Sequence, residues 1–354
     1  MHTERSENVA SMKILVTGAS GFIGSFIVEY ALNLGWTVWA GIRKSSSKVW
    51  LQDPRIRFIE LNLNNPQSLF DTLQQFQQQE GRWDYIVHAA GATKARNEAG
   101  FFAVNFDGTK NLVNAIEKLD MIPDCFVYLS SLSVMGAIKE NPSTSDDGCL
   151  YDNLTTEDQP CPNTAYGRSK WACEQFLKTK KNLPWVILRP TGVYGPREHD
   201  YYLMAKSIRQ HVDFAVGFRP QEITFIYVQD VVQAVFLVLC KTQETVGKTF
   251  ILSDGKTYSS RTFSNLIRRE LGVRCLVRIK APLWLLRLVC IGGELSARIT
   301  GRISALNKDK YNIMKQRNWR CDITPALSVG FKPEYDLERG VRETINWYKQ
   351  QKWI

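Results

Sequence analysis

The chain has 354 residues, of which 44% are hydrophobic, enough for one large domain or two ordinary domains with a buried core. Its net charge of +10 is concentrated near the C-terminus, where residues 261–354 hold 19 Lys and Arg against 8 Asp and Glu. These cations accompany no nucleic-acid motif, and the eight cysteines form no Cys-x-x-Cys pair, so neither nucleic acid nor a metal ion is expected as a partner.

The first 190 residues alternate short apolar runs with helical patterns. Strands are expected at 13–17, 36–42, 56–61, 84–90, 125–131 and 185–190, and helices at 21–35, up to about 79, 97–120 and 164–181. This alternation predicts an α/β fold with a doubly wound parallel sheet of the Rossmann type. Ligands bind such sheets at the C-terminal ends of the strands.

After Pro190 the alternation weakens, and this predicts a second, smaller domain that is interleaved with the first. We assign 12–190 and 224–250 to a dinucleotide-binding domain. We assign 191–223 and 251–354 to a C-terminal substrate domain.

The first expected strand runs into a glycine-rich turn, "VTGASGFIG", at residues 16–24. Gly18, Gly21 and Gly24 are three residues apart, between a strand and a helix. Glycine permits a tight turn and lets backbone N–H groups approach a pyrophosphate at the start of a helix. The spacing differs from the general G-x-G-x-x-G fingerprint, but the strand–turn–helix context favours dinucleotide binding.

The end of the second strand reads "AGIRKSSSK" and contains no acidic residue. An acid there would favour NAD by binding the ribose 2′-hydroxyl, whereas an arginine suits the 2′-phosphate of NADP. Arg43 and Lys44 therefore predict NADP as the cofactor, with NAD as the alternative. The competing interpretation is that both are ordinary exposed charges.

A tyrosine followed four residues later by a lysine occurs four times, at Tyr166/Lys170, Tyr202/Lys206, Tyr311/Lys315 and Tyr348/Lys352. Only Tyr166/Lys170 opens an expected helix beyond a serine-ended strand. Together with "TGASGFIG", "HAAG", "NFDGTKNLVNA", "YLSSLSVMG", "LRPTGVYGPR" and "YVQD", this pair makes the whole chain resemble the extended short-chain dehydrogenase/reductase family, also called the NAD-dependent epimerase/dehydratase family.

The resemblance implies that Tyr166 is the general acid or base, that Lys170 lowers its pKa and holds the nicotinamide ribose, and that Ser131 hydrogen-bonds the substrate oxygen. Asn62 stands where the family usually has Asp beside the adenine. A homodimer formed through the helices near 97–120 and 164–181 is also implied. The expected cofactor-binding residues, besides Tyr166 and Lys170, are Gly18, Ser20, Gly21, Phe22, Ile23, Gly24, Arg43, Lys44, Asn62, Leu63, Ala89, Ala90, Gly91, Asn105, Pro190 and Val193.

Several positions separate this chain from the sugar-nucleotide branches of the family. Leu132 and Ser133 replace the Asp–Glu pair of the 4,6-dehydratases, Ile223 and Thr224 occupy the stretch where epimerases carry an arginine, and Met135 replaces a common Tyr. The chain looks closer to the 3β-hydroxysteroid dehydrogenase/dihydroflavonol reductase branch, which implies a neutral, fairly apolar small-molecule substrate. The alternatives are a sugar-nucleotide epimerase or reductase and a non-catalytic dinucleotide sensor.

No apolar stretch at the start resembles a signal peptide, and residues 281–293, the longest apolar run, fall short of a bilayer span. A cytoplasmic protein is therefore expected. Residues 282–303 combine leucines and a tryptophan with arginines. This segment could cover an apolar pocket, touch a membrane surface or form an ordinary buried helix.

Overall fold

The computed structural model describes residues 12–143, 148–300 and 307–354. Its centre is a seven-stranded sheet in the order β11-β6-β5-β4-β1-β2-β3, with every neighbouring pair parallel. The strands are β1 (Lys13–Thr17), β2 (Thr37–Ile42), β3 (Arg57–Glu60), β4 (Tyr85–His88), β5 (Cys125–Leu129), β6 (Trp185–Pro190) and β11 (Thr249–Leu252). The predicted doubly wound α/β fold is confirmed.

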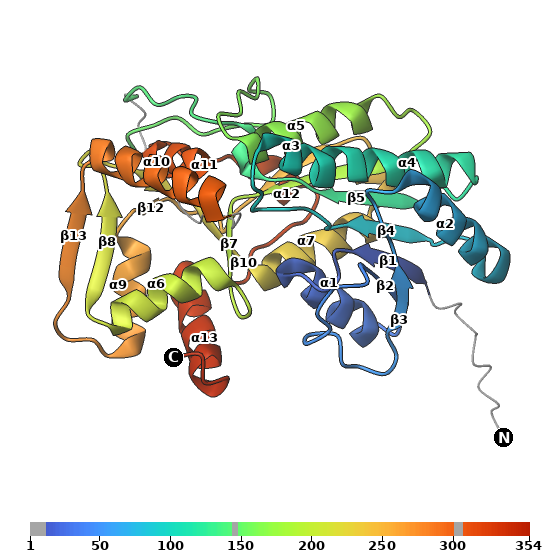
Figure 1. Cartoon of the computed structure of the whole chain (residues 1–354), viewed down its shortest axis with the longest axis horizontal. Helices are drawn as coiled ribbons and strands as arrows, with labels where there is room; N and C mark the ends of the chain where they lie inside the picture. The colour runs from blue at the N-terminus through green and yellow to red at the C-terminus, as the bar shows by residue number, and fades with distance from the viewer. Residues whose placement is uncertain (1–11, 144–147, 301–306) are drawn as a thin grey trace.

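Helices cover both faces of this sheet, as Figure 1 shows. On one face α1 (Phe22–Asn33) packs against α7 (Val228–Cys240), and both are rich in buried aliphatic side chains. The other face carries α2 (Pro66–Glu80), α4 (Gly108–Lys118) and α5 (Ala165–Lys178). Because the central strands are buried on both faces, they are mostly apolar; β5, for example, reads Cys-Phe-Val-Tyr-Leu.

A smaller part of the chain lies beyond the C-terminal ends of the strands (Figure 1). It contains three two-stranded sheets: β7 (Gly192–Tyr194) with β10 (Phe225–Tyr227), β8 (Val212–Val216) with β13 (Val277–Ala281), and β9 (Glu222–Ile223) with β12 (Tyr258–Ser259). Its helices are α6 (His199–Arg209), α9 (Thr262–Leu271), α10 (Leu283–Thr300), α11 (Lys308–Lys315) and α13 (Leu337–Gln350). Short helical segments complete the chain: α3 (Glu98–Phe101), the π-helix η1 (Phe102–Asp107), the 3₁₀-helix η2 (Leu132–Val134), α8 (Thr242–Thr245) and α12 (Thr324–Ser328).

Some boundaries differ from the sequence-based expectations. Residues 251 and 252, which we assigned to the substrate domain, belong to β11 and so to the large sheet. The helix expected at 97–120 is interrupted by the π-helical turn η1, which contains Asn105. The rest of the domain assignment stays a prediction.

Within the described part of the chain, no helix is both long and apolar enough to cross a membrane. Of the segment 282–303, residues 301–303 lie outside the described residues.

Candidate active site

A cavity of about 470 Å³ lies where β1, β2, β3 and β4 end. Nine of the predicted cofactor residues line it: Gly18, Ser20, Gly21, Arg43, Asn62, Leu63, Ala89, Ala90 and Gly91. Gly18 has a φ of +68°, and a Cβ on it would lie 2.7 Å from the backbone N and Cα of Ala90. The turn therefore comes so close to the end of β4 that only glycine fits.

The start of α1 suits a dinucleotide pyrophosphate. Its N-cap is Gly21, no side chain caps the helix, and its first turn has no acidic residue. The N–H groups at this helix end are thus left for a ligand, and the positive end of the helix dipole favours an anion. The residues present fit the phosphates of an NAD(P) cofactor.

A second cavity of about 370 Å³ continues the first one outward and is lined by Arg43, Lys44, Ser45, Glu60 and Asn62, among others. Arg43 lines both cavities, while its backbone N–H is held by the Ser46 hydroxyl at 3.0 Å. Two cations and two hydroxyls close to one another suit a phosphate, although the carboxylate of Glu60 lines the same cavity.

The other predicted cofactor residues do not line these two cavities. Phe22 and Ile23 pack against the core beneath α1, and a Cβ on Gly24 would collide with the carbonyl oxygen of Gly18. Pro190 ends β6, and Val193, in β7, packs against the same core. For these five residues the structure gives a packing role that shapes the site.

Tyr166 and Lys170 lie one turn apart on α5, and Ser131 follows the end of β5. Lys170 is almost fully buried; its Nζ donates a hydrogen bond to the carbonyl oxygen of Leu129 at 2.7 Å and lies 4.7 Å from the centre of the Tyr128 ring. Ser131 Oγ donates to Ser133 Oγ and accepts from the Ser133 N–H, both at 3.1 Å. The structure thus brings all three predicted catalytic residues to the same strand end.

Burial shifts the pKa values of both α5 residues. It raises the pKa of Tyr166 to about 12, although a hydrogen bond with Ser131 acts in the opposite direction. It lowers the pKa of Lys170 to about 8. The net rise comes from the loss of water around the phenolate, and the expectation that Lys170 lowers the Tyr166 pKa stays a prediction. Tyr166 therefore keeps its proton at neutral pH.

Asn105 connects the cofactor cavity to α5. Its Oδ1 accepts from the Ala92 N–H at 2.7 Å, and its Nδ2 donates to the Ala92 carbonyl at 3.2 Å and to Ser169 Oγ at 2.8 Å. A Cβ on Gly91 would lie 3.2 Å from both Asn105 Oδ1 and Lys170 Nζ. Asn105 therefore fixes the loop after β4 beside the Lys170 ammonium.

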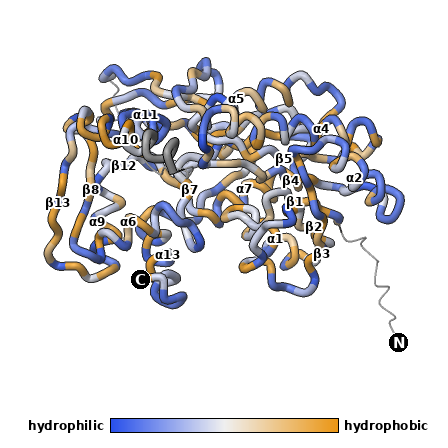
Figure 2. The backbone as a smooth tube through the Cα atoms, viewed as in Figure 1, coloured by the Kyte–Doolittle hydropathy of each residue, from blue (hydrophilic) through white to orange (hydrophobic). Residues whose placement is uncertain are grey.

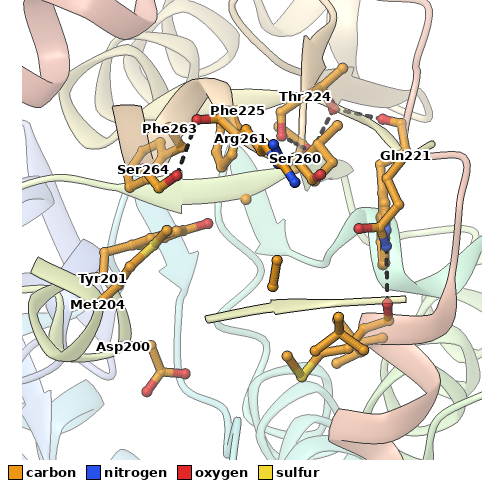
Figure 3. A pocket seen from close by; sticks show the side chains of 18 of the residues that line it. Asp200, Tyr201, Met204, Gln221, Thr224, Phe225, Ser260, Arg261, Phe263 and Ser264 are labelled. Carbon is orange, nitrogen blue, oxygen red and sulfur yellow. Dashed lines mark hydrogen bonds between the residues drawn. The ribbon is translucent and has the colours of Figure 1, made fainter. Parts of the chain in front are cut away.

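A third cavity, of about 510 Å³, separates the large sheet from the smaller part of the chain. Figure 3 shows Tyr201 and Met204 of α6 on one side and Gln221 on the other, with Phe225, Arg261 and Phe263 along a further wall. Ser131 lines this cavity, and Thr93 lines both it and the cofactor cavity. A substrate in the third cavity would thus meet both Ser131 and the cofactor side.

The positions that separate the chain from its sugar-nucleotide relatives also lie here. Leu132, Ser133, Ile223 and Thr224 all line the third cavity. Met135 does not: it is fully buried, and its sulfur accepts a hydrogen bond from Arg189 at 3.3 Å.

Two residues at the site, Asp309 and Arg261, escaped the sequence analysis, and a third, His88, was seen only as the first residue of "HAAG" without a role. Asp309, on α11, accepts hydrogen bonds from the Ala165 N–H at 3.0 Å and the Tyr166 N–H at 3.2 Å, and so caps the helix that carries Tyr166. His88 is buried between Thr17 Oγ1 (2.7 Å) and Thr109 Oγ1 (2.9 Å), with its pKa lowered to about 3 by burial, so it is neutral. Arg261 is exposed at the third cavity. Nothing in the sequence signals the Asp309 contact, which joins residues more than 140 positions apart.

None of the other three tyrosine–lysine pairs lies on α5: Tyr311/Lys315 is on α11, Tyr202/Lys206 on α6, and Tyr348 on α13. Tyr348, for instance, is buried in the cluster around α13, where its hydroxyl donates to the Glu198 carbonyl at 2.9 Å.

Comparisons with known proteins agree with this picture. The sequence model of the NAD dependent epimerase/dehydratase family matches residues 14–252. The chain is 24% identical to a decarboxylating sterol-4-alpha-carboxylate 3-dehydrogenase of Candida albicans, over 98% of this chain and 99% of the other. It is 25% identical to the N-acetyl-alpha-D-glucosaminyl-diphospho-ditrans,octacis-undecaprenol 4-epimerase of Escherichia coli, over 94% of both chains. The solved UDP-glucose 4-epimerase of Thermotoga maritima superimposes with a TM-score of 0.73 at 21% identity, covering 96% of this chain and all of that one, and so has the same fold.

Proposed function

Because the chain belongs to the NAD-dependent epimerase/dehydratase family and is thus an NAD(P)-dependent enzyme, we propose that it interconverts a secondary alcohol and a ketone on a neutral, fairly apolar small molecule. One observation carries this proposal. The Ser131 hydroxyl opens into a cavity whose walls include Met204, Phe225 and Phe263 rather than a cluster of cations. An apolar ketone would find burial there, with a hydrogen-bond donor for its oxygen.

The catalytic steps follow from the side chains. A bound dinucleotide supplies or accepts the hydride. Ser131 would hydrogen-bond the carbonyl oxygen, and Tyr166, protonated at neutral pH, would donate its proton to that oxygen as negative charge develops. In the oxidation direction the same phenol would take the proton back. Lys170 would stabilise the tyrosinate that forms, since its ammonium lies one helical turn away.

NADP is the proposed form of the cofactor. Arg43 and Lys44 line the outer cavity, where a ribose 2′-phosphate would sit, and a guanidinium binds phosphate well. Glu60 in the same cavity is the feature that opposes this choice, because a carboxylate repels a phosphate.

The names of two relatives also support an apolar substrate. One names a sterol carboxylate and the other a sugar joined through a diphosphate to undecaprenol, so both name compounds with a large apolar part. At these identities they suggest the class of substrate rather than its structure.

A sugar-nucleotide epimerase or reductase is the second candidate, and Arg261 is the observation that favours it. The cavity carboxylates are already paired: Asp200 with Lys94 at 2.7 Å, and Asp213 with the Ser264 hydroxyl at 3.0 Å. The Arg261 guanidinium could therefore bind a diphosphate in place of the arginine that is missing near Ile223.

Turnover separates the candidates. Purified protein should oxidise NADPH with members of a panel of neutral, apolar ketones, and Tyr166→Phe should lower kcat about a thousandfold while leaving the NADPH Kd unchanged. Arg261→Gln should leave ketone reduction intact. Tight binding of UDP-sugars that Arg261→Gln abolishes would favour the epimerase. If no ketone or sugar nucleotide reacts and Tyr166→Phe leaves the NADPH Kd unchanged, the result favours the third alternative, a dinucleotide sensor.

A further inference from the structure

Most of the exposed side chains of α10 between residues 284 and 291 are apolar. Trp284 and Leu288 are 65% and 58% exposed, and Leu285, Val289 and Ile291 are exposed as well. The opposite side, with Leu286 and Cys290, is buried. A surface helix normally presents polar residues to water, so an apolar outer side indicates a surface that something else covers.

This apolar surface continues onto the sheet formed by β8 and β13. Phe214 pairs with Ile279 in the parallel register, so the two side chains share a face, and both are exposed. Gly217 N–H donates to the Ala281 carbonyl at 2.9 Å, which places the exposed Phe218 beside the point where β13 leads into α10. Figure 2 shows hydrophobic colour recurring along β8 and β13. We call these exposed residues of β8, β13 and α10 the apolar rim.

Cations surround the rim. Residues 273–293 contain Arg274, Arg278, Lys280 and Arg287 but no Asp or Glu. All four are exposed, but Arg278 is paired with Asp213 at 3.5 Å, which leaves Arg274, Lys280 and Arg287 as the main positive charges. Apolar side chains among exposed positive charges suit the headgroup region of an anionic bilayer, where the former bury and the latter meet lipid phosphates. A second copy of the chain fits less well, because a symmetric contact would bring these cations against each other.

The rim also adjoins the third cavity. Phe214 belongs to the rim and also lines the cavity. Its neighbours Ala215 and Val216 line the cavity as well. On another side the cavity is lined by Ile313 and Met314 of α11, the helix that packs against α10. One rim element, β8, therefore also encloses the cavity, and a second, α10, packs against the helix α11 that lines it.

We propose that the apolar rim docks on an anionic membrane surface and that the substrate is a membrane-resident lipid which enters the third cavity beside Phe214. The part of this inference that concerns the substrate rests on the function proposed above. Docking lets an apolar molecule leave the bilayer and reach Ser131 without crossing water, and so explains why apolar side chains remain exposed at the cavity.

Flotation with vesicles tests the docking step without turnover. The full chain should bind vesicles of equal parts phosphatidylcholine and phosphatidylserine, and bind phosphatidylcholine vesicles at least about tenfold more weakly, since each cation near an anionic surface adds about 1 kcal/mol. The double variant Trp284→Glu/Leu288→Glu should reduce binding to the anionic vesicles by about tenfold or more. Leu34→Glu, on a leucine after α1 that is 48% exposed, is the control and should bind like the unchanged protein.

Melting temperature and NADPH affinity show whether the double variant is folded, because neither Trp284 nor Leu288 lines the cofactor cavity. The docking proposal is overturned if the unchanged protein binds neither kind of vesicle. It is also overturned if the double variant still binds the vesicles but is a monomer where the unchanged protein is a dimer, because the rim would then be a contact between two copies of the chain. The substrate proposal requires that the double variant lose reduction of a vesicle-embedded ketone but keep that of a small water-soluble one. Vesicle binding without any ketone reduction would sink the proposed function and leave the docking surface standing.

Discussion

The cofactor side and the substrate side of this protein are built in different ways. Around the cofactor cavity, the close contacts are made with the backbone. Gly18 lies against the backbone of Ala90, and the Asn105 side chain holds the backbone of Ala92 with two hydrogen bonds. Around the third cavity, the walls are side chains of α6, β8, α9 and α11, several of them exposed to solvent. The first arrangement tolerates almost no change of shape, whereas the second can change its lining without moving the main chain.

This difference explains why one side of the molecule is easy to assign and the other is not. A dinucleotide imposes the same phosphates and riboses on every protein that binds it, so its site depends on a few backbone positions. A substrate cavity depends on which side chains fill a given space, and many sets of side chains give a similar volume.

The largest effect should come from removing the close contact in the cofactor turn. Gly18→Ala places a methyl group against Ala90 and forces alanine to a φ of +68°, so we expect dinucleotide affinity to fall at least about a hundredfold. Gly35→Ala is the control: its φ is +76°, but a Cβ there meets nothing within 4 Å. Titration calorimetry with NADPH checks both variants. Equal losses would mean that backbone strain alone matters, and that the cofactor side is less tightly built than we infer.

Lys170 should carry the next largest effect, on stability as a function of pH. Its folded-state pKa of about 8 lies below the ordinary value of 10.5, so below pH 8 the buried ammonium destabilises the fold, and this cost disappears as the pH rises toward 10.5. Lys170→Met has no such charge. The unfolding free energy of the variant minus that of the unchanged protein should therefore shrink by up to about 3 kcal/mol between pH 7 and pH 10. Denaturant titrations across that range measure it, and a constant difference would contradict the shift.

Arg43 tests whether the outer cavity selects the cofactor. Arg43→Ala should weaken NADPH about thirtyfold and NADH by much less, because only the 2′-phosphate needs the guanidinium. Lys48→Ala removes an exposed cation from the same loop, outside the cavity, and should change neither affinity. Fluorescence titration with both nucleotides gives the ratios. Equal weakening of NADPH and NADH would identify Arg43 as an ordinary surface charge.

The smallest effect should appear where the two sides meet. Asp309→Ala removes the carboxylate that caps α5, which should cost about 1 kcal/mol of stability and lower kcat about fivefold by loosening the backbone of Tyr166. Asp336→Ala removes the N-cap carboxylate of α13, which accepts from the Arg339 N–H at 2.9 Å, and should cost similar stability without changing kcat. If both variants keep full kcat, the cap is purely structural.

The sequence predicted the large sheet because buried parallel strands need apolar runs and the helices between them need amphipathic ones. The resemblance to the family also implied that Ser131, Tyr166 and Lys170 act together, and the structure brings them to the same strand end. The sequence could not predict Asp309, because the contact depends on how α11 folds back over α5. Nor could it predict the raised pKa of Tyr166, which results from the burial of the side chain rather than from its spacing to Lys170.

The Asp309 cap has a consequence for anyone who wishes to retarget this enzyme. Chimaeras that exchange the C-terminal segment for that of a relative would replace Ile313 and Met314, which is the purpose, but would also replace the residue that anchors the first turn of α5. The exchange would then alter the proton donor together with the specificity. A graft that keeps residues 307–312 and begins the exchange at Ile313 separates the two, since Asn312 Nδ2 also holds the Asn163 carbonyl at 2.7 Å just ahead of that helix.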